Sequence, residues 1–594
     1  MQVVSDAWKA AHTERLLDEN FLEVTIEIGD PESMQDGQAS DNGADELSNT
    51  AGIARGVSIT PPKYALLDWN SWTLDGTYKM LPDDHPDETG FIGSAVCQED
   101  GIFATPPVIS INFTKTFERP IPGITITWSP EYDEYPRSFR IEAYDGDRLV
   151  SQANVTDNNS TVSPVSFDID SYSRMVITVY DWCLPLHRAR VADVFIGLKK
   201  SYKKNDIVSY NNNVSISPLS DRLPKYEINF DVSNVSGEYD PNNPNSLTRY
   251  LMERQAVGVR YGMLVKGKAE YIDGGRFYLN EWTAPQNGIT AQFKARDVLE
   301  YMQGTYYRGK YNPAGVTLYE LAESVLTDAD LPLIRGGVNP WELDESLKII
   351  KTTAALPMCT IAECLQLIAN AARCVLTFDR TGKIRITRMQ TAPVDYTVSA
   401  FNSYRRPELK LSKQLKSVEV DVFSYYAGNT GVKIYEGTIP VSGTQTVVLE
   451  YAESAVDVSA SVSGGELVSA AYYANACELE IRASGNVSIT VTGTQLKNSA
   501  STLTLHVGGD GETEHLSNPL VTASEDAAAI AEFIRSVLTN RRTFEMEWRS
   551  DTRLDVGDVI HIDNKYGSET AYVTKLKYHF TGGFRADGEA RATT

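Results

Sequence analysis

The stretch Glu238–Leu251 (EYDPNNPNSLTRYL) gathers side chains that could hold a calcium ion. Its candidate oxygen ligands are Asp240, Asn242, Asn243 and Asn245. A calcium loop of the EF-hand type has Asp or Asn at its first, third and fifth positions and Glu at its twelfth. Asp240 and Asn242 fit the first two requirements, but Pro244 occupies the fifth position and Leu251 the twelfth. Because Asx side chains bond to their own backbone and proline presets φ, the sequence predicts a turn here, not a metal site.

No other combination of residues carries a catalytic signature. The motifs HExxH and GxSxG and the P-loop are missing from the sequence, and the seven histidines have no zinc-ligand spacing. The six cysteines form no CxxC pair, and Cys364 lies on the apolar face of an expected helix, which favours a core role over metal binding. A glycosidase pair could be assembled from the 79 acidic residues in many ways, so it stays an unsupported alternative. We predict no catalytic residue, no cofactor and no metal.

Composition indicates a large, mainly β protein with several domains. The chain has 594 residues, 42% of them hydrophobic and 23% charged, which indicates a globular protein too long for one domain. Its 31 tyrosines and its recurring short runs of Val, Ile, Thr and Tyr favour strands. The net charge of −24 argues against a duplex-DNA binder. No run of about eighteen apolar residues occurs and the N-terminus lacks an apolar segment, so we expect cytoplasmic synthesis with no membrane span or Sec signal.

Three helices and one hairpin have clear local signals. Two expected helices open with a capping box, formed by Thr317 with Glu320 and by Thr360 with Glu363, ahead of apolar residues at helical spacing. A third helix is expected within residues 522–542. The run CVLTFDRTGKIRITRM predicts a hairpin that turns at Thr381–Gly382.

Short alternating runs separated by turn residues predict a β-sandwich over residues 61–200. A strand is expected before it, at Phe21–Gly29, and others follow from residue 226 onward. Insertion of a domain is tolerated where the host chain forms an exposed hairpin. If the sandwich is such an insertion, the strand at Phe21–Gly29 should pair beside residues 206–217 (DIVSYNNNVSIS).

Residues 202–594 resemble, as an ordered pattern, the hub proteins of phage tail tips and baseplates. In that family a strand ending in Asn-x-x-Gly and an Asp-Pro loop precede a G-x-x-V-x-V-x-YG strand, a G-x-F-Y-I strand and a terminal A-x-D-x-L. The matching residues are Asn234, Gly237, Asp240, Pro241, Tyr261, Gly262, Gly275, Phe277, Tyr278, Ala295 and Asp297. The expected fold class is therefore mainly β with a minor α/β part, a multi-domain phage tail hub fold with an inserted β-sandwich of the jelly-roll type.

The resemblance implies a ring-forming homotrimer at the distal end of the tail tube, assembled in the host cytoplasm and located in the virion. Its implied partners are the distal tail protein, the tail tube protein, the tape measure protein and the tail fibre or receptor-binding proteins. Such a ring closes with complementary edges and needs no chemistry. Its acidic charge lies either along the lumen, where it would repel DNA, or on the outer face.

The sandwich is similar to the galactose-binding-like jelly roll of discoidin-type modules. The matching residues are Leu74, Asp75, Gly76, Pro136, Phe139, Ile141, Tyr144, Asp145, Arg190, Val191 and Gly197. This resemblance implies a host glycan that stacks on exposed aromatic rings, with Tyr132, Tyr135, Trp128 and Trp72 as candidate residues. The alternative is that these rings are core residues, as Trp and Tyr often are in small sandwiches. Tyr132 and Tyr135 are expected to be the most exposed because they lie in a turn (SPEYDEYP).

The sequence thus predicts a structural tail-tip or baseplate hub and no enzyme. The expected segments are an N-terminal hub strand and acidic loop (1–60), the inserted sandwich (61–200), a hub β domain (201–305), an α/β hub domain (306–402), a small β domain (403–520) and a C-terminal helix with closing hub strands (521–594). Two alternatives stay open. One is a glycan-binding adhesin, and the other is a glycoside hydrolase with a carbohydrate-binding module.

Overall fold

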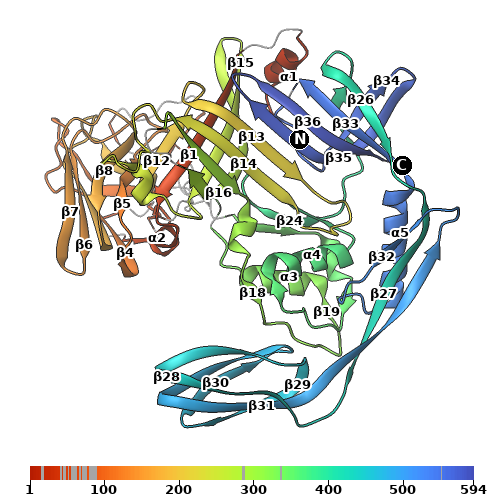
Figure 1. Ribbon diagram of the computed structural model, residues 1–594. Coiled ribbons are helices and arrows are strands. Elements are labelled where there is room, and N and C mark those ends of the chain that lie inside the picture. The colour runs from red at the N-terminus through yellow and green to blue at the C-terminus, as the bar shows by residue number, and fades with distance from the viewer. Residues whose placement is uncertain are drawn as a thin grey trace.

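The protein is mainly β with a small α/β part, which confirms the predicted fold class (Figure 1). The computed structural model describes residues 1–14, 19–40, 43–44, 48–50, 52–54, 63–65, 68–69, 76–78, 90–283, 288–332, 334, 338–549 and 551–593. Two short helices, α1 (Asp6–His12) and α2 (Pro31–Asp36), lie near the start of the chain.

A sheet of thirteen strands forms the body of the molecule. Eleven of these strands run in the spatial order β12 (Gly197–Tyr202), β1 (Asn20–Gly29), β15 (Ala256–Val265), β16 (Lys268–Thr283), β17 (Thr290–Arg296), β14 (Lys225–Ser233), β13 (Ile207–Ser215), β35 (Gly567–Phe580), β36 (Phe584–Ala592), β33 (Arg542–Arg549) and β26 (Ser403–Leu411). The other two are β34 (Val559–Asn564), which pairs with β35, and β25 (Pro393–Val398), which pairs with β34.

The antiparallel pairing of β13 with β35 makes the two halves of this sheet continuous. It runs from Tyr210 opposite Phe580 to Ser215 opposite Lys575, so strands more than 350 residues apart in sequence lie side by side. One hydrophobic core, which extends from Trp8 to Ala592, lies under both halves. The first and last parts of the chain are therefore one packed body.

The strand β1 confirms the prediction of a strand at Phe21–Gly29, but the predicted partner was wrong. We expected it beside residues 206–217, whereas Thr25 lies opposite Ser201 of β12 and Gly258 of β15. The reason is that an alternating pattern fixes which face of a strand is buried and leaves its neighbour open. The strand that leaves the sandwich, β12, occupies the place beside β1.

Between β1 and β12 the chain forms a β-sandwich with one shared core, whose members include Ile141, Ile177 and Ile126. One of its sheets contains β2 (Gln38–Ala39), β4 (Val108–Phe117), β9 (Tyr172–Val179), β6 (Phe139–Asp145) and β7 (Arg148–Val155). Facing it are β11 (Asp193–Phe195), β5 (Ile121–Thr127) and β8 (Val162–Ile169), and the pair β10 (Arg188–Val191) and β3 (Phe91–Val96). The strand β2 pairs with β4, so residues before 61 also belong to this packing unit.

Two glycines lie opposite each other at the root of the sandwich. Gly29 ends β1 and pairs with Gly197, the first residue of β12. A Cβ atom on Gly197 would lie 2.2 Å from the carbonyl oxygen of Ile28, and its φ of +147° is one that other residues rarely adopt. The close approach of the two backbones therefore depends on this pair.

The α/β part contains the two helices that open with the predicted capping boxes. α3 (Leu318–Thr327) is capped by Thr317 and α4 (Ile361–Ala371) by Thr360, each with the expected reciprocal glutamate bond. The small strands here are β20 (Trp341–Leu343), β24 (Ile384–Thr387), β23 (Val375–Phe378), β18 (Thr305–Tyr306), β22 (Cys359–Thr360), β19 (Val316–Thr317) and β21 (Lys351–Thr352). The antiparallel pair β23–β24 confirms the predicted hairpin.

A long arm leaves the body and curves below the α/β part (Figure 1). Its strands are β27 (Leu415–Ala427), β28 (Val432–Glu450), β29 (Ala455–Ser463), β30 (Glu466–Tyr472), β31 (Ala476–His506) and β32 (Glu512–Leu516). The 31-residue strand β31 pairs with β28 in the tip and with β27 in the stem, so one strand runs through both. The tip has its own hydrophobic core.

The tip of the arm rests on the α/β part through polar contacts. The backbone amide of Ala474 donates to the carbonyl of Gly309 at 2.8 Å, and the side-chain amide of Asn475 donates to the carbonyl of Leu356 at 3.2 Å. Arg308 lies 3.3 Å from the carboxylate of Glu478. The stem is anchored by packing against the predicted third helix, α5 (Ser524–Thr539), since both contribute to the core that contains α3 and α4.

The glycine root of the sandwich gives a first prediction. Substitution of Gly197→Ala should lower the free energy of unfolding by about 1–3 kcal/mol, because the new Cβ meets a backbone oxygen at a strained φ. Calorimetric or denaturant unfolding measures this. The matched control is Gly258→Ala in β15, which pairs with the other side of β1, where a Cβ would have nothing within 4 Å. Equal stability of the two variants would contradict the role of the root.

Candidate functional site

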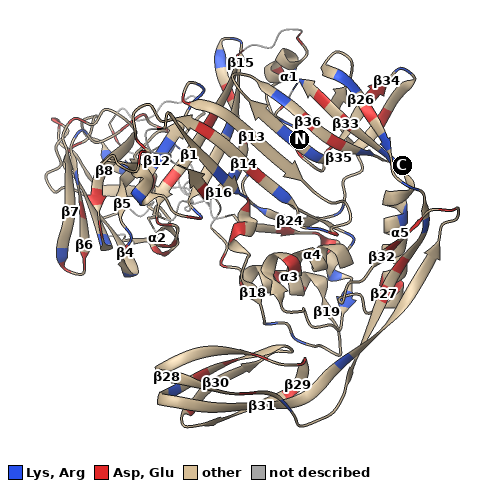
Figure 2. Cartoon of the chain, in the orientation of Figure 1, with Lys and Arg blue, Asp and Glu red and all other residues tan. Residues whose placement is uncertain are grey.

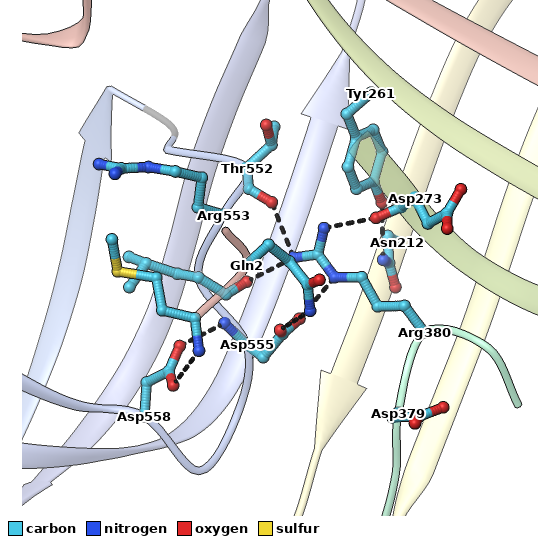
Figure 3. Close-up of polar contacts among 12 residues, drawn as sticks. Gln2, Asn212, Tyr261, Asp273, Asp379, Arg380, Thr552, Arg553, Asp555 and Asp558 are labelled. Atoms are coloured by element: carbon cyan, nitrogen blue, oxygen red, sulfur yellow. Dashed lines mark hydrogen bonds and ion pairs between the residues drawn. The ribbon is translucent and has the colours of Figure 1, made fainter. Parts of the chain in front are cut away.

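The side chain of Arg380 joins three separate parts of the chain (Figure 3). It lies in the turn between β23 and β24 and is 9% exposed. Its guanidinium donates to the carboxylate of Asp555 at 2.7 Å and to the carbonyls of Asp273, Thr552 and Leu554 at 2.7, 2.7 and 3.0 Å. The first β half, the α/β part and the C-terminal half therefore meet at one buried cation.

Neighbouring groups complete this junction. The side-chain amide of Gln2 donates to the second carboxylate oxygen of Asp555 at 2.8 Å. The backbone amide of Gln2 donates to the carbonyl of Arg553. On the opposite side the hydroxyl of Tyr261 bonds to that of Tyr210 at 2.8 Å and accepts from Asn212 at 3.0 Å. Gln2 thus ties the N-terminal segment to the C-terminal half of the sheet, whereas the Tyr261 bonds lie within the first half, with the Tyr261 ring next to the Arg380 guanidinium.

A small cavity of about 40 Å³ lies beside Arg380, enough for one or two water molecules. Asp297 reaches this cavity and is the N-cap of the short 3-10 helix Val298–Tyr301, where it accepts from the amides of Leu299 and Tyr226. Burial raises the pKa of Asp297 to about 7. The cavity is too small for a substrate, so this carboxyl has a structural role.

A larger groove of about 480 Å³ lies beside α1 and contains the carboxylates of Asp395 and Asp551. Burial would raise the pKa of Asp551, but hydrogen bonds from Arg553 outweigh this and leave it lowered. A glycosidase acid must hold a proton near neutral pH, which Asp551 cannot do. Asp551 is therefore no candidate for the acid of such a pair.

The predicted turn at Asp240 is present. The carboxylate of Asp240 accepts from the backbone amide of Asn242 at 2.9 Å, and the side-chain oxygen of Asn243 accepts from the backbone amide of Asn245 at 3.0 Å. Asn234, which directly follows β14, is 2% exposed, and its side chain accepts from the backbone amide of Tyr239. Across the described ranges, no group of three His, Cys, Asp or Glu side chains is arranged to hold a metal ion. The same ranges contain no helix of sufficient length and hydrophobicity to cross a membrane.

The motif residues that carry the hub resemblance serve turns, caps and close packing. Gly275 lies next to the bulge where β16 shifts register against β15, and it has a φ of +133°. A Cβ on Gly262 would lie 2.7 Å from the ring of Tyr271. Tyr261 lies at the Arg380 junction and Asp297 caps a helix. These positions are explained by architecture.

The four aromatic residues proposed for glycan binding differ in their exposure to solvent. Trp128 has no exposed surface, and its ring contacts Phe139 at a centroid distance of 4.9 Å. Tyr132 and Tyr135 are partly exposed. Trp72 lies outside the described residues. In the single chain Trp128 thus has no free face for a sugar, and glycan binding by the other three residues stays a prediction.

Beneath Tyr132 lies a buried charged cluster that sequence reasoning missed. Glu134 bonds to His187 at 3.0 Å and to Arg190 at 3.2 Å, and Arg190 also pairs with Asp68. Burial lowers the pKa of His187, but the Glu134 carboxylate outweighs this and leaves it raised. The guanidinium of Arg190 lies 4.4 Å from the centre of the Tyr132 ring. No local motif signals this cluster, because its members are far apart in sequence.

One end of the strand order of the large sheet is β26, and the other is β12. Apolar side chains are exposed on or next to β26, namely Phe401, Tyr404, Leu409 and Leu411, which are 42–63% exposed. Pro407 and two register shifts interrupt the ladder of β26 with β33. Figure 2 shows acidic and basic residues interspersed over the large sheet, whereas the arm tip carries few charges. The strand β26 also exposes Arg405 and Lys410, which pair with Glu547 and Glu545 of β33, so apolar and charged side chains alternate along this edge.

Comparisons with known proteins give matches among solved structures. A 43 kDa prophage MuSo2 tail protein from Shewanella oneidensis aligns over 66% of this chain and 95% of its own, at 13% identity and a TM-score of 0.37. A tail protein from Neisseria meningitidis aligns over 66% and 93%, at 9% identity and 0.34. An E. coli type VI secretion component aligns over 66% and 74%, at 7% identity and 0.31. No family model and no curated protein matches the sequence.

The Arg380 junction gives a second prediction. The variant Arg380→Met should lose about 3–5 kcal/mol of stability, because it leaves a buried carboxylate and three carbonyls without their donor. The matched control is Arg385→Met in the next strand, where the pair with Glu342 is 41% and 45% exposed and should contribute less than about 1 kcal/mol. Denaturant titration compares them. Similar losses in both variants would show that the junction is not a principal contact.

The raised pKa of Asp297 gives a third prediction. Between the unfolded value and about 7 the folded state holds a proton that the unfolded state releases, so stability falls as pH rises through this range. The difference in unfolding free energy between the native protein and Asp297→Asn should therefore shrink steadily from about pH 5 to pH 8.

A matched cap provides the control for this pH dependence. Asp344 caps another 3-10 helix through the amide of Ser346. Burial would raise the pKa of Asp344, but hydrogen bonds from Ser346 outweigh it and leave it lowered. Asp344→Asn should therefore differ from the native protein by a constant amount over the same pH range. A flat profile for Asp297→Asn would contradict the assignment.

Proposed function

We propose that this protein is a structural hub of a phage tail tip or baseplate, or of a related phage-derived particle. One observation carries the proposal: the residues that resemble the hub family are used for turns, caps and close packing in one continuous sheet. Gly275, Tyr261 and Asp297 have such roles. Rigidity and shape depend on turns, caps and close packing of this kind, whereas a catalyst needs a reactive group in a cleft.

The proposed hub acts as a homotrimer at the distal end of the tail tube, where it joins the tube or distal tail protein to the tip and helps to close or gate the lumen. Apolar side chains at the β26 edge support a lateral contact, since Leu409 and Leu411 are exposed there beside Lys410. Pro407 and the interrupted ladder disfavour open-ended strand addition, so the contact would be made by side chains. Closed rings require such a limited, complementary edge.

The sandwich is proposed as an exterior module that contacts neighbouring tail proteins or a host glycan. Its attachment through the paired glycines of β1 and β12 places it outside the large sheet (Figure 1). Trp69 is 66% exposed, and its carbonyl lies 2.5 Å from a ring nitrogen of His187 in the buried charged cluster. An exposed aromatic ring on a backbone fixed in this way suits sugar stacking. This feature supports the adhesin as the second candidate function.

Immunogold electron microscopy of particles from the native source tests the proposal and is the fourth prediction. Antibodies raised against the full chain should label one end of the tail, because a hub occupies only that position. Pre-absorption of the antibodies with purified chain is the control and should abolish the label. Tail-bearing particles that lack this chain by mass spectrometry would overturn the hub and favour the adhesin.

A further inference from the structure

The start of α4 carries two cysteines where helices commonly carry an apolar contact. Thr360 is the N-cap, so Cys359 is the residue before the cap and Cys364 is the fourth residue of the helix. Apolar side chains at these two positions pack together as a hydrophobic staple. In α3, which has the same capping box, Val316 and Leu321 occupy the equivalent places. The helix start therefore brings the two cysteine side chains together.

The two sulfur atoms are 3.3 Å apart, within hydrogen-bonding distance for thiols. Cys364 is fully buried in the core shared with α3, and Cys359 is partly exposed. The backbone around them is held by the capping box and by the pairing of Cys359 with Tyr306. The pair is thus pre-oriented, and its contact does not depend on a mobile segment.

We propose that Cys359 and Cys364 are a reversible disulfide site, closed by a small-molecule disulfide and opened by a thiol. In the closing reaction the Cys359 thiolate attacks one sulfur of the reagent, which forms a mixed disulfide and expels one thiolate. Cys364 then attacks the Cys359 sulfur and expels the second thiolate. Two electrons pass from the protein to the reagent, and the two cysteine protons end on its two thiols. One protein S–S bond of about 2.05 Å replaces two S–H groups.

The environment assigns the order of attack. A hydrogen bond from Cys364 lowers the pKa of Cys359, whereas the bond to Cys359 and burial raise the pKa of Cys364. The thiolate is the nucleophile, so the partly exposed Cys359 reacts first with a dissolved reagent. Cys364 needs no access to solvent because its target is already in contact with it.

The disulfide would fix the segment on which the arm rests. Leu356, which accepts the bond from Asn475 of the arm tip, lies three residues before Cys359. Tyr306, the strand partner of Cys359, lies three residues before Gly309, which accepts the bond from Ala474. If the proposed function is correct, this disulfide is reduced during assembly in a reducing cytoplasm and forms after the particle leaves the cell.

Peptide mapping of the full-length protein tests the site. Trypsin releases residues 352–373, which contain Cys359 and Cys364 and no other cysteine. After reductant is removed and oxidised glutathione is added, this peptide should become about 2 Da lighter, because disulfide formation removes two hydrogen atoms. It should also resist alkylation. Thiols titrated in denaturant should fall from six to four, and dithiothreitol should restore them.

Two variants serve as controls. Cys359→Ser should retain its five thiols under the same treatment or gain a mixed disulfide, without an internal bond. Cys183→Ser removes another partly exposed cysteine and should still lose two thiols. A native peptide 352–373 that stays fully alkylated, or that carries glutathione without an internal bond, would overturn the proposal. Both outcomes are independent of where the protein is found in a particle.

Discussion

A buried guanidinium must have its donors satisfied, and this constraint at Arg380 determines how the molecule is assembled. Its partners are a carboxylate and carbonyls from Asp273 and from residues 552–555, so the two β halves and the α/β part must be in place together. The β13–β35 pairing and the common core act over the same boundary. Removal of one partner leaves the others uncompensated, which makes the three parts cooperative.

The sandwich and the arm are attached to this body in different ways. The sandwich is joined to the body where Gly29 and Gly197 allow two backbones to come close, and again through Asp168 of β8, which pairs with Arg249 and Tyr250 of the body. The arm has two attachments, the stem packed against α5 and the tip held by Gly309 and Leu356. The sandwich is therefore held close to the strands from which it arises, whereas the two attachments of the arm lie at its opposite ends.

Sequence reasoning succeeded where a short stretch of chain determines the structure. The capping boxes at Thr317 and Thr360 and the hairpin at Thr381–Gly382 depend on neighbours within four residues. It failed for the partner of β1, because alternation specifies a face and not a neighbour. Arg380 resembles an ordinary turn residue, and its partners are more than 100 positions away. Trp128 shows the same limit, since residue type did not distinguish a core ring from a binding surface.

The continuity of β31 has a mechanical consequence. Interstrand hydrogen bonds lie perpendicular to antiparallel strands. A pull along the axis of β31 therefore strains many bonds of the β28 and β27 ladders at the same time, whereas a pull across the strand would open them one after another. Because the same strand passes through tip and stem, tension applied at the tip reaches the base without crossing a flexible joint. We therefore expect the arm to resist extension along the axis of β31 more strongly than a pull across it.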